Sequence, residues 1–99
     1  MIVRIFFDTR LDFKFLTNRL PLAVRDCVQS QKKLICQRLL AISIGRRTPH
    51  VGLKVTCKRG TYLVTCTLGE SSDSFPDAGT AYDLSIEEIE LLPRSSRKP

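Results

Sequence analysis

The chain has 99 residues, of which 42% are hydrophobic and 26% are charged, and its formal net charge is +6 at pH 7. This length and composition predict one globular domain over residues 1–92 with a flexible basic tail at residues 93–99, and they exclude wholesale disorder. No apolar run reaches the roughly 18–20 residues of a membrane span, and the first residues lack the pattern of a secretory signal, so we expect an intracellular protein, cytoplasmic or nuclear, without membrane contact.

The charges divide the chain into a basic body and an acidic segment. Residues 1–68 contain thirteen Lys and Arg side chains against three Asp, whereas residues 69–92 contain seven acids and no Lys or Arg. A basic body favours polyanionic partners, because Lys and Arg clusters attract acidic surfaces and release counterions from a phosphate backbone. The acidic segment offers either a second docking surface or a mask for the basic body.

The first sixteen residues predict a β-hairpin. Residues 2–7 are rich in strand formers, and residues 11–16 alternate between apolar and charged side chains, with Leu11, Phe13 and Phe15 on one face. We therefore expect these three side chains to anchor the core.

A helical apolar spacing follows and predicts one amphipathic helix over residues 21–37, with Pro21 in its first turn. A longer helix would place Arg38 in the apolar stripe. We therefore expect residues 38–44 to form a strand that ends at Gly45, with a helix running on to Ile42 as the alternative.

The clearest local pattern is a second hairpin. Residues 51–58 and 61–68 alternate in polarity around Arg59-Gly60, which we expect to form a two-residue turn and to place Cys57 opposite Tyr62. One face of this hairpin is apolar and belongs in the core, namely Val51, Leu53, Val55, Cys57, Tyr62, Val64, Cys66 and Leu68. The other face is polar, rich in threonine and positively charged.

The last quarter of the chain begins with an acidic loop, expected over residues 69–82. Ser85 and Glu88 fit a helix capping box, which favours a short C-terminal helix over residues 85–92. The alternative is an edge strand over residues 81–92. The expected fold is thus α+β, with two antiparallel β-hairpins, one main amphipathic helix and the element order ββαβββα.

The residues that carry catalysis or bind metals are sparse. The four cysteines have no zinc-type spacing, and His50 is the only histidine, so we expect free thiols, no metal and no cofactor. Cys57 and Cys66 share a face but lie too far apart along the expected hairpin for a disulfide. Without a base held beside a nucleophile, and without a phosphate-binding glycine loop, we expect no catalytic residues and no enzyme.

Binding is the function that the sequence favours. The expected partner-binding or polyanion-binding side chains lie on the helix, a basic loop and the second hairpin, and they are Arg25, Lys32, Lys33, Arg46, Arg47, Lys54, Lys58 and Arg59. We expect a protein-interaction module, such as an accessory subunit, adaptor or inhibitor, that meets an acidic protein surface through this basic face. The alternative is a protein that contacts the phosphate backbone of RNA or DNA through the same residues.

Overall fold

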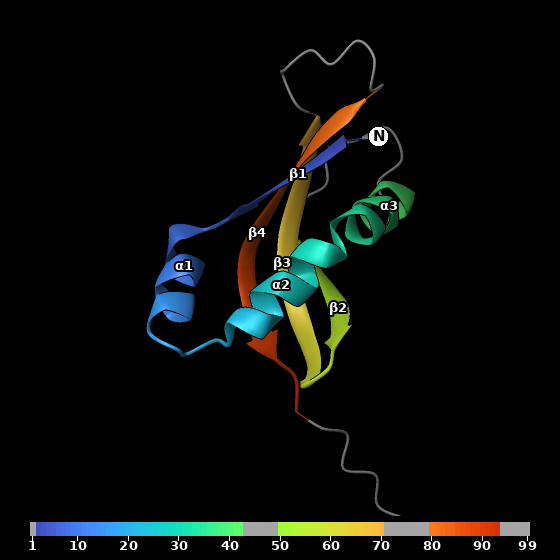
Figure 1. Cartoon of the computed structure of the whole chain (residues 1–99). Coiled ribbons are helices and arrows are strands. Elements are labelled where there is room, and N and C mark those ends of the chain that lie inside the picture. Colours follow the sequence, from blue (N-terminus) through green and yellow to red (C-terminus); the bar gives the residue numbers. More distant parts are fainter. Residues whose placement is uncertain (1, 43–49, 71–79, 94–99) are drawn as a thin grey trace, which may run out of the picture.

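The computed structural model describes residues 2–42, 50–70 and 80–93. These residues form four strands and three helices in the order βαααβββ: β1 (Ile2–Phe7), α1 (Thr9–Leu16), α2 (Leu22–Ser30), α3 (Lys32–Ile42), β2 (Val51–Cys57), β3 (Gly60–Glu70) and β4 (Ala81–Leu91) (Figure 1). The small single α+β domain is confirmed, whereas the order ββαβββα and the pair of simple hairpins are wrong. None of the described helices has the length and apolarity needed to span a membrane.

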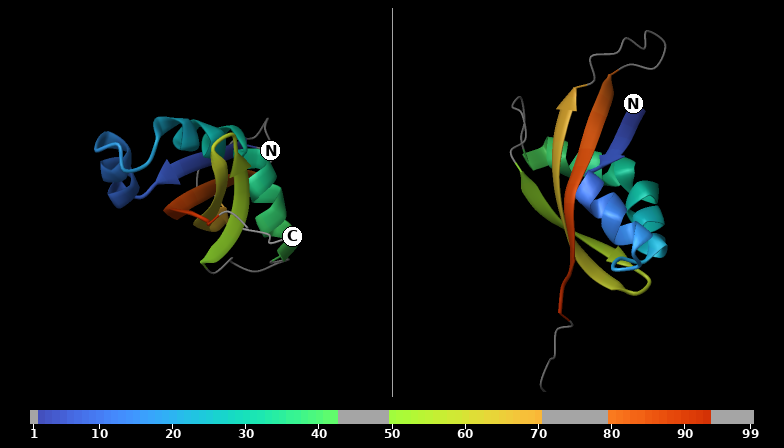
Figure 2. Two further views of the ribbon diagram at one scale, coloured as in Figure 1. Left: turned by 90° about the horizontal axis from the view of Figure 1, so that it is seen from below. Right: turned by 90° about the vertical axis from the view of Figure 1, so that its left-hand side faces the viewer.

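The four strands form one mixed sheet in the order β1-β4-β3-β2. β1 runs parallel to β4, and the other neighbouring pairs are antiparallel. Figure 2 shows this sheet as strongly twisted, with α2 and α3 packed on one side of it. The first and last described strands therefore pair with each other, although Arg4 and Asp83 on them are 79 residues apart in sequence.

The expected N-terminal hairpin is wrong because its second half is helix α1. Asp8 caps this helix, with its carboxylate accepting a hydrogen bond of 2.9 Å from the backbone N–H of Arg10. Leu11 and Phe15 are one turn apart and are buried, whereas Phe13 is 56% exposed. Phe13 is therefore not the core anchor that the alternating pattern predicted.

The expected single helix is two helices that meet at Gln31. α2 ends there, with the backbone N–H of Gln31 bonded to the carbonyl groups of Cys27 and Val28, and α3 begins at Lys32. The buried residues Ile35 and Leu39 continue the stripe of Val24 and Val28 at spacings of seven and four, so Arg38 lies beside this stripe and is exposed. The expected strand over residues 38–44 is thus wrong as far as Ile42, where α3 ends, and residues 43–49 lie outside the described residues.

The β2–β3 hairpin has the predicted faces in a register two residues away. Tyr62 lies opposite Val55 rather than Cys57, and Lys58-Arg59 forms the turn. Gly60 therefore begins β3, where its φ of +150° is one that other residues rarely adopt. A shift of two residues keeps every side chain on its expected face, because strand side chains alternate with a period of two.

The C-terminal segment is strand β4 rather than a helix over residues 85–92, and β4 lies between β1 and β3 rather than at an edge. The pairing with β3 shifts between Thr65 and Cys66, which lie opposite Glu88 and Ile86, so Glu87 is an extra residue in the ladder. The expected loop over residues 69–82 is shorter, because β3 extends to Glu70 and β4 begins at Ala81; residues 71–79 are outside the described residues.

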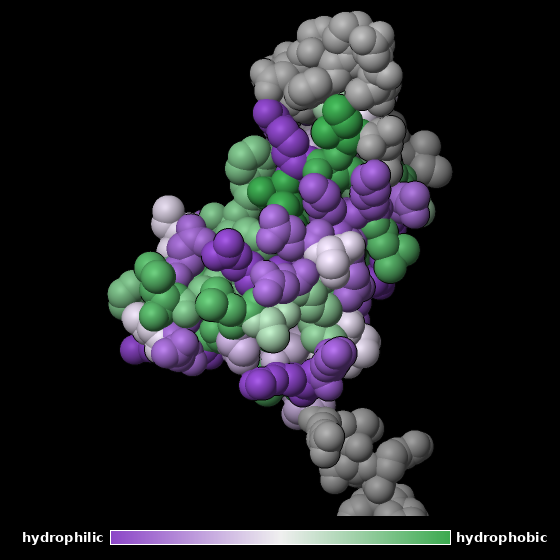
Figure 3. All heavy atoms as spheres, viewed as in Figure 1, coloured by the Kyte–Doolittle hydropathy of each residue, from purple (hydrophilic) through white to green (hydrophobic). Residues whose placement is uncertain are grey.

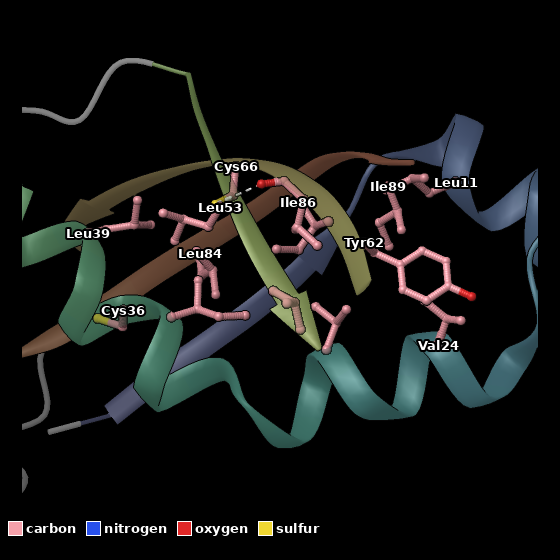
Figure 4. Packing of buried hydrophobic residues seen from close by; sticks show 14 of the residues in the cluster. Leu11, Val24, Cys36, Leu39, Leu53, Tyr62, Cys66, Leu84, Ile86 and Ile89 are labelled. Atoms are coloured by element: carbon pink, nitrogen blue, oxygen red, sulfur yellow. Dashed lines mark hydrogen bonds between the residues drawn. The ribbon is translucent and has the colours of Figure 1, made fainter. Parts of the chain in front are cut away.

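The core lies between the helices and the sheet face that they cover. Figure 4 shows Tyr62 reaching from β3 to Val24 on α2, and Leu11 on α1 beside Ile89 on β4. The other side of the sheet carries the alternate strand residues, including Lys54 and Glu88, which are exposed. We call this side the open face.

Candidate docking site at the edge of the sheet

The two edges of the sheet differ in how their backbone groups are satisfied. At β2, helix side chains bond to outward carbonyl groups: Gln31 donates to the carbonyl of Thr56 at 3.3 Å, and Arg38 donates to that of Lys54 at 2.9 Å. Backbone groups that are bonded in this way are not available to pair with another strand. At β1, none of the residues that the structure describes bonds in this way to the outward backbone groups of Ile5 or Phe7.

At β1, alternate residues direct their backbone groups toward β4. The N–H group of Ile2 donates to the carbonyl of Thr80, just before β4, and the N–H group of Asp8 donates to the carbonyl of Ile86 in β4. The intervening odd-numbered residues direct theirs away from β4. Across the described part of the chain, no hydrogen bond joins the backbones of Ile5 or Phe7 to another residue on that outer edge.

The outer edge of β1 opens into a hollow of about 750 Å³ between α1 and α2. Its apolar lining is Ile5, Phe6, Phe7, Phe15, Leu16 and Leu22, and its polar lining is Asp12, Asn18, Arg25 and Gln29. The rings of Phe7 and Phe15 meet edge to face, with centroids 6.0 Å apart, and so fix the lining where β1 meets α1.

Several of these apolar side chains are open to solvent. Leu16 is 82% exposed and Leu22 is 56% exposed, whereas the side chain of Phe6 projects to the open face because it alternates with Ile5 and Phe7 along β1. In Figure 3, hydrophobic side chains gather on the side of the molecule where α1 lies. Single exposed leucines are common on protein surfaces, but apolar side chains grouped around a hollow are typical of binding sites.

The helical layer that flanks the hollow is positively charged. Residues 9–42 contain seven Lys and Arg side chains and two Asp, which gives a local net charge of +5. The carboxylate of Asp8, just before these residues, accepts hydrogen bonds from the backbone N–H and the guanidinium group of Arg10. These hydrogen bonds lower the pKa of the Asp8 carboxyl. Arg25, an exposed residue of α2, carries part of the positive charge into the lining itself.

The basic residues singled out from the sequence are divided between the two sides of the sheet. Arg25 on α2 and Lys33 on α3 are exposed, and Lys32 is half-buried at the start of α3, all three in the helical layer. Lys54 lies on the open face, because its neighbours in β2 face the core. The sheet therefore separates Lys54 from the helical group.

The remaining predicted basic residues lie elsewhere. Lys58 and Arg59 are exposed in the turn between β2 and β3. Arg46 and Arg47 lie outside the described residues. The structure thus joins Arg25 to a hollow and leaves the other described members of the set as dispersed surface charges.

The acids of β4 lie away from the helical layer. Asp83 accepts hydrogen bonds of 2.8 and 3.1 Å from the guanidinium group of Arg4 on β1, and Glu87 pairs with His50. Glu88 and Glu90 are exposed on the open face. These acids therefore do not cover the hollow.

The cysteines form one disulfide, between Cys27 on α2 and Cys57 at the end of β2. The expectation of four free thiols is wrong for this pair, while Cys36 and Cys66 are free and buried. Burial raises the pKa of the Cys66 thiol to about 11, with a further contribution from the charge of Glu87. Among the described residues, no group of His, Cys, Asp and Glu side chains has the arrangement of a metal site.

Comparison of the chain with known protein families, with curated proteins and with solved structures gives no match. The site must therefore be interpreted from its own geometry. Sequence patterns identified Arg25 but missed Leu16 and Leu22, because their exposure depends on how α1 and α2 sit beside β1. The one local signal was Asp8, a residue type typical of a helix cap just before the misassigned segment.

Proposed function

We propose that this protein is a non-enzymatic interaction module that binds an extended, acidic and apolar segment of a partner protein in the hollow beside β1. The observation that supports this proposal most is the β1 edge at Ile5 and Phe7, where no described residue bonds to the outward backbone groups and which opens into an apolar hollow, while the β2 edge is capped by Gln31 and Arg38. Exposed strand edges with side-chain hollows beside them are a recurrent means of binding peptides.

The size and chemistry of the hollow suit a peptide. A volume of about 750 Å³ accommodates a few side chains, and sites of this size are commonly lined by apolar groups with a few polar ones that fix orientation. Leu16 and Leu22 form exposed apolar walls that a bound segment would shield from water. The net charge of +5 on the helical layer favours a segment that carries acids.

Nucleic-acid binding remains the alternative class, and the geometry favours it less. A phosphate backbone needs a continuous positive surface, but Lys54 is separated from Arg25 and Lys33 by the sheet. The open face that holds Lys54 also carries the exposed acids Glu88 and Glu90, which repel phosphates.

Selection from a random peptide library displayed on phage tests the proposal. The folded protein is immobilised, enriched peptides are sequenced, and their Kd values are measured by fluorescence anisotropy. We expect peptides with apolar residues at alternate positions and at least one acid. Leu22→Asp should weaken their binding about tenfold or more, because it places a carboxylate in the apolar wall.

The matched control is Leu34→Asp. Leu34 is an exposed leucine of similar exposure, 52% against 56%, but it lies on α3 and does not line the hollow. This variant should bind the peptides as the parent does. The proposal is wrong if no peptide is enriched, or if Leu22→Asp binds the enriched peptides unchanged. Tight binding of mixed-sequence RNA that survives moderate salt and is lost in Lys32→Glu/Lys33→Glu would support the alternative instead.

A further inference from the structure

Building on the proposed function, we infer that the partner segment joins the sheet as an added strand along β1, paired through its main chain to Ile5 and Phe7. Its alternate side chains then enter the hollow, and an acidic side chain meets Arg25. The inference specifies how the segment binds, which the presence of a hollow alone does not.

The outward backbone groups of Ile5 and Phe7 are available to pair with an added strand. Because Ile2 and Asp8 bond toward β4, Ile5 and Phe7 present their N–H and C=O groups outward, which makes two donors and two acceptors in line. Both residues are half-buried and line the hollow, whereas Val3 is only 3% exposed. Pairing is therefore available from Ile5 to Phe7 and not at Val3.

The faces of the sheet determine where the side chains of an added strand would point. Residues directly opposite each other in neighbouring strands project to the same face of a sheet. Ile5 and Phe7 share the helix-covered face with Val3, so ligand residues opposite them point into the hollow between α1 and α2. Apolar side chains at these ligand positions would contact Phe15, Leu16 and Leu22. The intervening ligand residues would project to the open face, beside Phe6.

The two walls of the hollow differ in charge. Leu22, Arg25 and Gln29 follow one another at spacings of three and four residues, so they form one stripe along α2 that passes from apolar to polar. The lining acid, Asp12, is on α1 at the other wall. A ligand carboxylate is therefore favoured at the α2 wall beside Arg25 and disfavoured at the α1 wall.

The same charges argue against a second copy of the chain as the occupant. Pairing of β1 with its own copy would bring together two helical layers of net charge +5 each. An acidic partner segment instead neutralises this charge as it binds. We therefore assign the edge to a heterologous partner.

Amide hydrogen exchange by NMR, with and without a peptide selected as above, tests strand addition. Saturating peptide should slow exchange at the Ile5 and Phe7 amides about tenfold or more. The Phe6 amide faces β4 and serves as the internal control, with little change expected. N-methylation of the peptide at the residue that bonds to β1 should weaken binding about tenfold or more, while N-methylation one residue away should be tolerated.

Charge exchange tests the acidic position. Arg25→Glu should weaken binding of the acidic peptide, and a peptide with Lys in place of its acid should restore it. Lys33→Glu, on an exposed residue outside the lining, is the control and should bind both peptides as the parent does. Circular dichroism verifies that each variant is folded.

The two proposals fail in different ways. If peptides bind in a Leu22-dependent manner but neither Ile5 nor Phe7 is protected and every N-methyl group is tolerated, strand addition is wrong while the docking function stands. If no peptide binds, the docking function itself is wrong. If the Ile5 and Phe7 amides become protected at high protein concentration without peptide, the occupant is a second copy and the heterologous partner is wrong.

Discussion

The Cys27–Cys57 disulfide has a large expected effect on stability. The bridge closes a loop with a sequence separation of 30 residues, and its Cα atoms are 6.1 Å apart. For a loop of this length, the chain-entropy relation gives a loss of unfolded-state entropy of about 12 cal/mol/K, or about 3.6 kcal/mol at 25 °C. Small domains have unfolding free energies of about 5–15 kcal/mol, so the double variant Cys27→Ser/Cys57→Ser should lose a substantial part of its stability.

Urea denaturation followed by circular dichroism measures this difference. With m values of about 1–3 kcal/mol/M, the midpoint of the double variant should fall by more than about 1 M, and a reductant should lower the parent midpoint similarly. In the double variant Cys36→Ala/Cys66→Ala, the bridge is intact, so its midpoint should still respond to the reductant. Equal parent midpoints with and without reductant, when mass spectrometry shows that the bridge has been reduced, would refute the entropy argument. Four free thiols in the untreated protein would refute the bridge.

Three further predictions concern the core, the helical surface and the buried thiol. Phe15→Ala should cost about 3–5 kcal/mol in urea denaturation, because Phe15 is 3% exposed, whereas Phe13→Ala should cost less than about 1 kcal/mol. Lys32→Glu/Lys33→Glu should leave the circular dichroism spectrum unchanged, and loss of helical signal would show that these side chains support the fold. Because the folded pKa of Cys66 is raised from 9.0 to about 11, its contribution to stability should be lost as the pH rises from about 9 to 11. Cys66→Ala should show a smaller loss over that range in urea titrations, and an equal loss would contradict the raised pKa.

The β2–β3 hairpin could be predicted because its evidence is local. The apolar alternation fixes which side chains face the core, and a register error of two residues does not change those faces. The strand expected over residues 11–16 is wrong because Leu11 and Phe15 fit both an alternating strand and one turn of a helix. The cap at Asp8, together with the exposure of Phe13, is consistent with the helix.

The C-terminal error has a different physical cause. Ile86 and Ile89 are three residues apart, which imitates helical spacing, yet both lie on the core side of a strand because Glu87 is an extra residue between them. A bulge changes the spacing of the residues that face the core from two to three, and the amino-acid sequence contains no separate pattern that identifies the bulge. The helix expected over residues 85–92 is based on the Ser85 and Glu88 capping box, and the spacing of Ile86 and Ile89 does not contradict a helix although these residues lie in a bulged strand.

The hollow beside β1 could not be predicted from local patterns. It requires that the backbone groups of Ile5 and Phe7 point away from the sheet, which depends on β1 pairing with β4, whose partner residues Arg4 and Asp83 are 79 residues apart. It also requires α1 and α2 to stand beside that edge, a tertiary arrangement that the helical periodicity of each segment does not determine. Arg25 was singled out for its charge alone, and its place in the lining follows from the fold.

The position of β4 determines when the sheet can form during folding. The last described strand occupies an inner position, so the β2–β3 hairpin can close early from neighbouring residues while β1 must wait for a partner far along the chain. A nascent chain that has not yet produced residues 81–91 has no native neighbour for β1 and only one for β3. Until then the backbone groups of β1 that bond to β4 have no native partner and can pair with other chains.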